Sequence, residues 1–195
     1  MNLALFDFDG TLTDKDSLAD FIKFAVGGKK YFLGLVKFLP IFILYKLKII
    51  KNDIAKERLL KQFFFGFDEQ KFKSVAKQYS LTKIDLILRD KIYQKLQTHK
   101  KQNDRVVIVS ASMECWLKDW CEKENIELIS TKLEFKNQKF TGKFLTKNCY
   151  GDEKVNRIKK YLTLKNYDKI YAYGDSKGDE AMLSLADYKY LIGKK

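Results

Sequence analysis

The first fourteen residues constrain this chain more than any other stretch, because they place two carboxylates at the end of a short apolar run. Residues 3–6 are long enough for a buried strand and too short for a helix. Asp7 and Asp9 follow. Residues i and i+2 of an extended chain point the same way, so both carboxylates are expected at the carboxyl end of the strand, where open α/β sheets bind ligands. Such carboxylates repel each other unless a cation or a shared proton holds them, and a hard divalent metal is the simplest solution.

An acidic turn after a strand is the alternative interpretation, since Asp and Gly are common turn residues. The segment nevertheless carries a specific pattern, F-D-F-D-G-T-L-T-D, over residues 6–14. It resembles motif I of the haloacid dehalogenase (HAD) superfamily, which reads D-x-D-G-T. The resemblance implies that Asp7 is a nucleophile and Asp9 a general acid and base, and that three further motifs follow in order.

Length and composition suit a folded enzyme of one domain, or one domain with a substantial insert. The chain has 195 residues, 46% of them hydrophobic, which is enough for a real core. Its three cysteines lack short metal-type spacing and it has a single histidine, so we expect reduced thiols and no zinc site. The first strand begins almost at Met1, so no targeting segment is expected and the predicted location is cytoplasmic.

The net charge of +13 is concentrated in the middle of the chain. Residues 15–105 hold 21 Lys and Arg against 9 Asp and Glu. A solvated lysine-rich surface is one interpretation, and attraction to anionic substrates, nucleic acid or an anionic membrane is the other. No nucleic-acid-binding motif accompanies the charge, so no nucleic acid partner is expected.

The sequence of the middle stretch predicts helices, and its most apolar segment, residues 31–50, has two interpretations. A helix is predicted over 17–26, ended by two glycines. Residues 31–50 are the most apolar run, but three lysines and Pro40 argue against a membrane-spanning helix. They form either a pair of short helices burying apolar faces inside a helical cap, or an interfacial segment that contacts an anionic bilayer peripherally, at the inner membrane, through residues 29–51.

The rest of the chain predicts a parallel α/β sheet. Helices are expected over 54–65, 69–79 and 83–100, and strand–helix alternation begins at residue 106. Strands are expected at 106–109, 126–130, 170–173 and 188–192, with a hairpin over 131–146. The fold class is therefore a Rossmann-like parallel sheet flanked by helices. We expect a catalytic core of residues 1–14 and 101–195, with a helical cap inserted at residues 15–100.

The remaining motifs of the HAD superfamily find matches in order. Ser110, with Ala111 after it, follows an apolar strand as the Ser/Thr of motif II does. Lys154 matches the motif III lysine, whose ammonium neutralises nucleophile and phosphate. Asp175, with Asp179 four residues on, matches the acidic motif IV. Each match alone is weak, but four in order are hard to obtain by coincidence.

The resemblance covers almost the whole chain, and the large insert between motifs I and II is similar to the phosphoserine phosphatase-like branch, subfamily IB. In that branch a Glu near the position of Asp16 binds the substrate ammonium, and an arginine near Arg58 binds its carboxylate. Here the alternative for Arg58 is an ordinary exposed helix arginine. Motif II reads Ser-Ala-Ser rather than Ser-Gly-Gly, and residues 31–50 are unusually apolar. These departures are more similar to uncharacterised subfamily IB hydrolases and phosphatidylglycerophosphate phosphatases.

The resemblance implies a Mg²⁺-dependent phosphomonoester hydrolase with an aspartyl-phosphate intermediate and a small phosphorylated substrate such as phosphoserine. A membrane-peripheral lipid phosphate phosphatase and a phosphotransferase are the alternatives. It further implies that Asp7, Asp9 and Asp175 hold the metal, with Asp179 behind them. The predicted phosphate-binding groups are the backbone N–H groups of Phe8 and Gly10, the hydroxyls of Thr11 and Ser110, and Lys154. The sequence predicts no oligomeric state.

Overall fold

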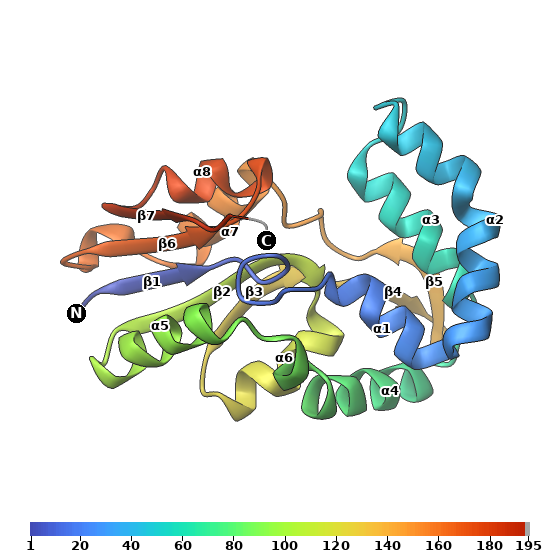
Figure 1. The fold of residues 1–195 in the computed structure, drawn as a ribbon, viewed down its shortest axis with the longest axis horizontal. Coiled ribbons are helices and arrows are strands. Elements are labelled where there is room, and N and C mark those ends of the chain that lie inside the picture. The colour runs from blue at the N-terminus through green and yellow to red at the C-terminus, as the bar shows by residue number, and fades with distance from the viewer. Residues whose placement is uncertain (194–195) are drawn as a thin grey trace.

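The apolar run after Met1 forms β1 (Leu3–Phe6), the central strand of a five-stranded parallel sheet in this computed structural model, which describes residues 1–193 (Figure 1). The strand order is β3-β2-β1-β6-β7. The other strands are β2 (Arg105–Met113), β3 (Glu127–Thr131), β6 (Ile170–Gly174) and β7 (Tyr188–Leu191). The catalytic core expected from the sequence runs to residue 195, and its last two residues lie outside the described range.

Both faces of the sheet are covered, because side chains alternate along β1. Ala4 and Phe6 belong to the core cluster on one face, and Leu3 and Leu5 to the cluster on the other. In Figure 1, α5 and α6 lie below the sheet and α8 above it. The flanking helices are α5 (Asp90–Lys101), α6 (Glu114–Lys123), α7 (Asp152–Tyr161) and α8 (Glu180–Leu183). The predicted fold class is confirmed.

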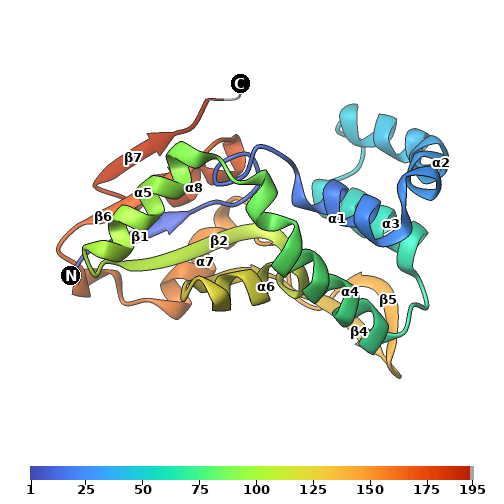
Figure 2. The same ribbon diagram turned by 60° about the horizontal axis from the view of Figure 1, so that its bottom comes forward.

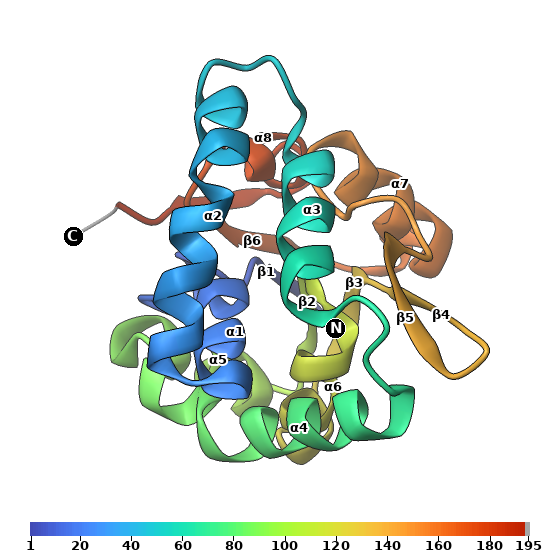
Figure 3. The same cartoon turned by 90° about the vertical axis from the view of Figure 1, so that its right-hand side faces the viewer.

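The insert after β1 is helical, as expected. It contains α1 (Ser17–Val26), α2 (Gly28–Lys46), α3 (Asn52–Phe64) and α4 (Glu69–Thr82). Asp16 begins α1 by accepting a hydrogen bond from the backbone N–H of Ala19 (3.0 Å). In Figures 1 and 3, α1, α2 and α3 stand beside the carboxyl ends of the strands, while α4 runs below them toward α6.

Residues 28–46 form a single helix, so the expected pair of short helices is wrong. The chain stays helical through Pro40, which is exposed. Within α2 only Gly34 and Phe38 are buried, so the apolar side chains are not packed inside a cap either. None of the helices in the described residues has the length and apolarity needed to cross a membrane.

The helix expected over 83–100 is divided in two. A short 3₁₀ helix (Ile84–Ile87) precedes α5, and Leu88 and Arg89 between them are extended. The interruption has a tertiary cause. The backbone N–H of Arg89 donates to Leu12 O (2.8 Å) and its Nε donates to Thr13 O (3.0 Å), which ties this segment to the loop after β1.

The boundary between core and cap stays a prediction, and two packing contacts bear on its position. α5 packs against β2, and α4 packs against α6, although both helices fall inside the stretch assigned to the cap (Figure 2). The predicted hairpin forms from β4 (Leu133–Lys136) and β5 (Lys139–Phe144), and β5 packs on α3. The insert is therefore attached to the core by several contacts along its length.

Candidate active site

Asp7 is the residue directly after β1, and its backbone still pairs with the neighbouring strand β6. Its backbone N–H donates to the carbonyl of Tyr173 on β6 (2.9 Å). The side chain is buried, with one carboxylate oxygen accepting from Lys154 Nζ (2.6 Å) and the other from Thr11 Oγ1 (3.1 Å). Burial raises the pKa of Asp7 to about 6, and the Lys154 charge limits that rise. The carboxyl is therefore mostly ionised at neutral pH.

Lys154 lies on α7 and joins two carboxylates. Its ammonium pairs with Asp7 and with Asp179, at 2.6 Å each, and the side chain is 1% exposed. Burial alone would lower the pKa of Lys154, but the two carboxylates raise it above its ordinary range. The lysine is thus a fixed positive charge next to Asp7.

Asp179 also holds the loop that follows β6. Its second carboxylate oxygen accepts from the backbone N–H groups of Asp175 (3.2 Å) and Ser176 (3.1 Å) and from the Ser176 hydroxyl (2.8 Å). Gly174 makes this approach feasible, because a β-carbon there would collide with the Asp179 side chain. The loop is therefore ordered by the same residue that pairs with Lys154.

The residues at this edge of the sheet fit a magnesium ion. Carboxylate oxygens of Asp7, Asp175 and Asp179 lie within 4.8 Å of one another, and carboxylate oxygens are the ligands that Mg²⁺ prefers. Gly10, in a left-handed conformation with φ of +85°, passes so close to Asp175 that a β-carbon would overlap its carboxylate. This group contains two of the predicted ligands, Asp7 and Asp175, and it contains the Asp179 carboxylate rather than that of Asp9. The assignment of the metal ligands stays a prediction.

Asp9 has different partners from Asp7, because the chain turns after the strand ends. One carboxylate oxygen accepts from the backbone N–H of Ser17 (2.7 Å) and the other from the Ser112 hydroxyl. Burial, and then the negative charge of Asp16, raise the pKa of Asp9 to about 7, although both hydrogen bonds favour the ionised form. A carboxyl of this kind can both give and take a proton near neutral pH.

The hydroxyl network around Asp9 continues into the core. Ser17 Oγ donates to Ser112 Oγ (3.0 Å) and accepts from the indole N–H of Trp116 (3.2 Å). The backbone N–H of Ser112 donates to Ser110 Oγ (3.0 Å). These hydrogen bonds connect the end of β2 and the start of α1 to the carboxyl group of Asp9. The position of Asp9 is fixed by groups that are almost completely buried.

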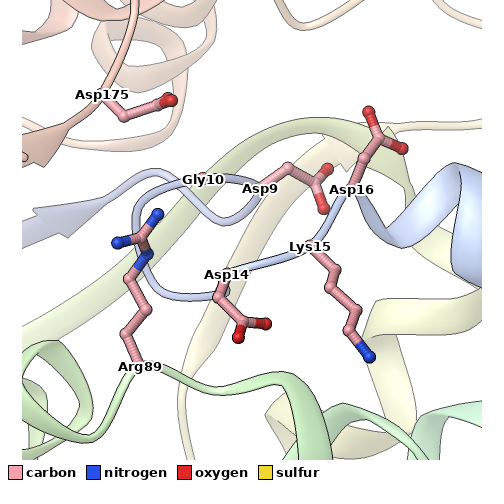
Figure 4. A pocket seen from close by; sticks show the side chains of 7 residues that line it. All are labelled: Asp9, Gly10, Asp14, Lys15, Asp16, Arg89 and Asp175. Atoms are coloured by element: carbon pink, nitrogen blue, oxygen red, sulfur yellow. The ribbon is translucent and has the colours of Figure 1, made fainter. Parts of the chain in front are cut away.

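A cleft of about 490 Å³ opens beside these residues. Figure 4 shows Asp175 on one side of the Gly10 turn and Asp9 on the other, with the Arg89 side chain reaching toward that turn from below. The remaining lining residues are Asp14, Lys15 and Asp16. The cleft is therefore lined by four carboxylates, those of Asp9, Asp14, Asp16 and Asp175, and by two cationic side chains.

The structure does not bring Arg58 to this cleft. Arg58 is exposed on α3, whereas Lys56 on the same helix is half-buried and its Nζ donates to the carbonyl of Ala111 (3.3 Å). Asp16 lines the cleft, as its predicted substrate-binding role requires, and also caps α1. Lys56 is consequently the cation that α3 directs toward the core.

Two further residues that the sequence assigned to the site, Phe8 and Ser110, are buried, and their roles stay predictions. Phe8 is buried, its ring packed edge-on against Trp120, so only its backbone is available to a ligand. Ser110 is buried at the carboxyl half of β2. Ser17, Arg89 and Ser112 are among the residues that contact or line the site but were not assigned to it from the sequence. A second serine two residues after Ser110 was the only available signal, and serines are common after strands.

The haloacid dehalogenase-like hydrolase family model matches residues 4–184, which contain every one of these groups. The chain belongs to this family. The Caulobacter vibrioides (strain NA1000 / CB15N) protein CicA is 29% identical over 189 residues, covering 96% of this chain and 84% of CicA.

Several solved structures share the fold of this chain. A Bordetella pertussis Tohama I protein described as having unknown function superposes with a TM-score of 0.79 at 20% identity, covering 95% of this chain and 86% of its own. An apo phosphoserine phosphatase gives a TM-score of 0.65 at 16% identity, covering 96% and 84% respectively. At these identities the similarity concerns the fold. It agrees with the predicted phosphoserine phosphatase-like architecture.

Proposed function

We propose that the protein is a Mg²⁺-dependent phosphomonoester hydrolase that forms an aspartyl-phosphate on Asp7. The observation that carries this proposal is the placement of two carboxyl groups in different environments. Asp7 is paired with Lys154, while Asp9 is held by the Ser112 hydroxyl and the Ser17 amide. A nucleophile and a separate acid and base are what a two-step phosphoryl transfer requires.

In the first step, a carboxylate oxygen of Asp7 attacks phosphorus and the ester P–O bond breaks. The leaving oxygen takes the proton of Asp9, whose pKa of about 7 keeps that proton available at neutral pH. In the second step, ionised Asp9 accepts a proton from water as the water oxygen attacks the phosphorus of the aspartyl-phosphate. Asp7 is regenerated and phosphate leaves, and Asp9 has recovered the proton that it gave to the leaving oxygen in the first step.

The phosphoryl oxygens are bound by groups that surround Asp7. Lys154 provides a fixed charge, and the hydroxyls of Thr11 and Ser110 and the backbone N–H groups of Phe8 and Gly10 provide hydrogen bonds. The carboxylates of Asp7 and Asp175 and the backbone carbonyl of Asp9 would hold Mg²⁺, which would supply positive charge to offset the repulsion between phosphate and nucleophile.

The proposed substrate is a small phosphorylated metabolite, of which phosphoserine is the type. The cleft carries both signs of charge, because Arg89 and Lys15 line it together with four carboxylates, and this suits a zwitterionic ester. Lys56 takes the place proposed for Arg58 at the boundary between insert and core. All three cysteines are free, which agrees with a reducing compartment. A lipid phosphate is the second candidate, favoured by the exposed apolar side of α2.

Phosphate release by the purified full chain tests the proposal. The substrates are p-nitrophenyl phosphate, phosphoserine and a lysolipid phosphate, each with Mg²⁺ or with chelator. Asp7→Asn should abolish release, whereas Asp168→Asn, at an exposed ion pair with the N-terminus, should not change it. Release by Asp7→Asn at the wild-type rate would refute the nucleophile. Product analysis with added alcohols separates hydrolysis from transfer to another acceptor.

A further inference from the structure

One side of α2 exposes a continuous apolar surface. Its members recur at helical spacing and are 37–66% exposed. We name the α2 face by these side chains: Phe32, Leu35, Val36, Leu39, Phe42 and Ile43. Leu47 and Ile49, in the turn after α2, extend it and are 63% and 65% exposed. Large contiguous apolar patches are uncommon on monomeric proteins without a binding role.

The orientation of this face is fixed by packing on the opposite side of α2. Gly34 and Phe38 are buried there, and Gln62 Nε2 on α3 donates to Gly34 O (2.6 Å). A β-carbon at Gly34 would overlap the ring of Phe63, so the two helices approach closely only because this residue is glycine. In Figure 3, α2 and α3 run side by side, and the turn that connects them lies at the opposite end of the pair from α4. The α2 face therefore points away from the core.

The charge around the α2 face is of one sign. Six lysines lie between residues 29 and 51, and no Asp or Glu occurs from residue 21 to residue 52. Lys29, Lys30 and Lys37 are exposed on α2, and Lys46, Lys48 and Lys51 are exposed at or after its end. At 100° per residue, Lys29 and Lys46 are the α2 lysines that lie nearest the apolar side chains. Apolar side chains with a lysine fringe are the features by which amphipathic helices bind anionic lipid surfaces.

We propose that the α2 face docks the protein on an anionic lipid bilayer, with its apolar side chains between the headgroups and its lysines at the anionic surface. The charge pattern argues against a second copy of this chain as the occupant, because an isologous dimer would bring the two lysine fringes together. The bilayer needs no matching shape, and its charge is opposite. This inference does not depend on the catalytic proposal.

Vesicle co-sedimentation of the full chain tests the proposal, using the Asp7→Asn variant so that lipid chemistry cannot interfere. Vesicles of phosphatidylcholine alone are compared with vesicles that contain phosphatidylglycerol at one part in three. We expect binding to the anionic vesicles at least tenfold tighter. Each basic side chain near an anionic surface contributes roughly a fivefold change, so Lys29→Gln/Lys46→Gln should weaken binding by about 25-fold.

A matched pair of variants distinguishes binding through the α2 face from nonspecific binding through other exposed apolar side chains. Val36→Gln/Leu39→Gln replaces two exposed side chains on the face and should reduce vesicle binding by tenfold or more. Leu145→Gln/Leu191→Gln replaces two similarly exposed leucines that lie outside α2, and should bind as before. Both doubles should keep the circular dichroism spectrum and melting temperature of the parent, because the replaced side chains are exposed.

Three outcomes would overturn the proposal. The first is no sedimentation with anionic vesicles at moderate salt. The second is equal binding to both vesicle types, which would remove the role of the lysines. The third is a concentration-dependent dimer, seen by analytical ultracentrifugation, that Val36→Gln/Leu39→Gln dissociates. That result would make the α2 face an interface between copies.

Discussion

Replacing Ser112 by alanine tests whether the buried hydroxyl network sets the chemistry of Asp9. Ser112 is fully buried, and its hydroxyl donates to the Asp9 carboxylate while accepting from Ser17 Oγ at 3.0 Å. A hydrogen bond to a charged group contributes about 1.5–3 kcal/mol, so losing it should lower kcat by roughly 10- to 150-fold. The free energy of unfolding should fall by about the same 1.5–3 kcal/mol at a pH where Asp9 is ionised, because the same hydrogen bond is lost.

The pH profile distinguishes this positioning role from simple damage to the fold. The Ser112 hydrogen bond favours ionised Asp9, so its removal raises the pKa of Asp9 above its value of about 7. The limb of the kcat–pH profile that reports loss of the Asp9 proton should therefore move to higher pH. The assay is steady-state phosphate release from p-nitrophenyl phosphate between pH 5 and 9.

Ser130 provides the matched control for this variant. It is also a buried serine, on the adjacent strand β3, but among the described residues its hydroxyl has no hydrogen-bond partner. Ser130→Ala should leave kcat and the pH profile unchanged and should not destabilise the protein. Equal kcat values for Ser112→Ala and the parent, or a loss of kcat without a shift in the profile, would refute the reasoning about Asp9.

Three further predictions concern charges at the site. Lys154→Met leaves the buried carboxylates of Asp7 and Asp179 without a positive partner, and should lower the free energy of unfolding by about 3–5 kcal/mol in metal-free buffer. Urea unfolding measures this change, and an unchanged urea midpoint would contradict the proposed ion-pair network. Lys56→Ala should raise KM at least tenfold with little effect on kcat, whereas Arg58→Ala should be silent, and the reverse result would restore the sequence-based assignment. The pKa values of Asp7 and Asp9, about 6 and 7, lie above the ordinary value of 3.8. The folded metal-free protein therefore binds more protons than the unfolded chain does. The stability that these two groups contribute is lost as the pH rises from about 4 to 7. Bound Mg²⁺ offsets the repulsion, so the increase in melting temperature on adding Mg²⁺ should be larger at pH 7.5 than at pH 5, and a pH-independent increase would count against the site.

The sequence predicted the catalytic strand end because its determinants are local. Residues 3–6 can only be a buried strand, and motif spacing places Asp175 after another strand of the same sheet. Parallel pairing then brings the carboxyl ends of β1 and β6 together without further information. The fold class follows from the same alternation of strands and helices. These features need no knowledge of side-chain packing.

The sequence could not show which side of each cap helix packs against the core, or which groups the serine hydroxyls contact. Lys56 and Arg58 are two residues apart, about 200° around a helix, so choosing between them requires the packing of α3. Ser112 reaches Asp9 across 103 residues of chain, and nothing local marks that contact. The continuity of α2 through Pro40 was also missed, because the general cost of an internal proline outweighed the apolar periodicity.

The central claim is the covalent phosphoryl transfer to Asp7, and trapping that intermediate tests it most directly. The full chain carrying Asp9→Asn is mixed with p-nitrophenyl phosphate and Mg²⁺, quenched in acid, digested and analysed by mass spectrometry. Asp9→Asn slows the second step, so a phosphate adduct is expected on the peptide that contains Asp7, and it should be absent with chelator. No adduct during measurable turnover, or an adduct on a different residue, would contradict the account.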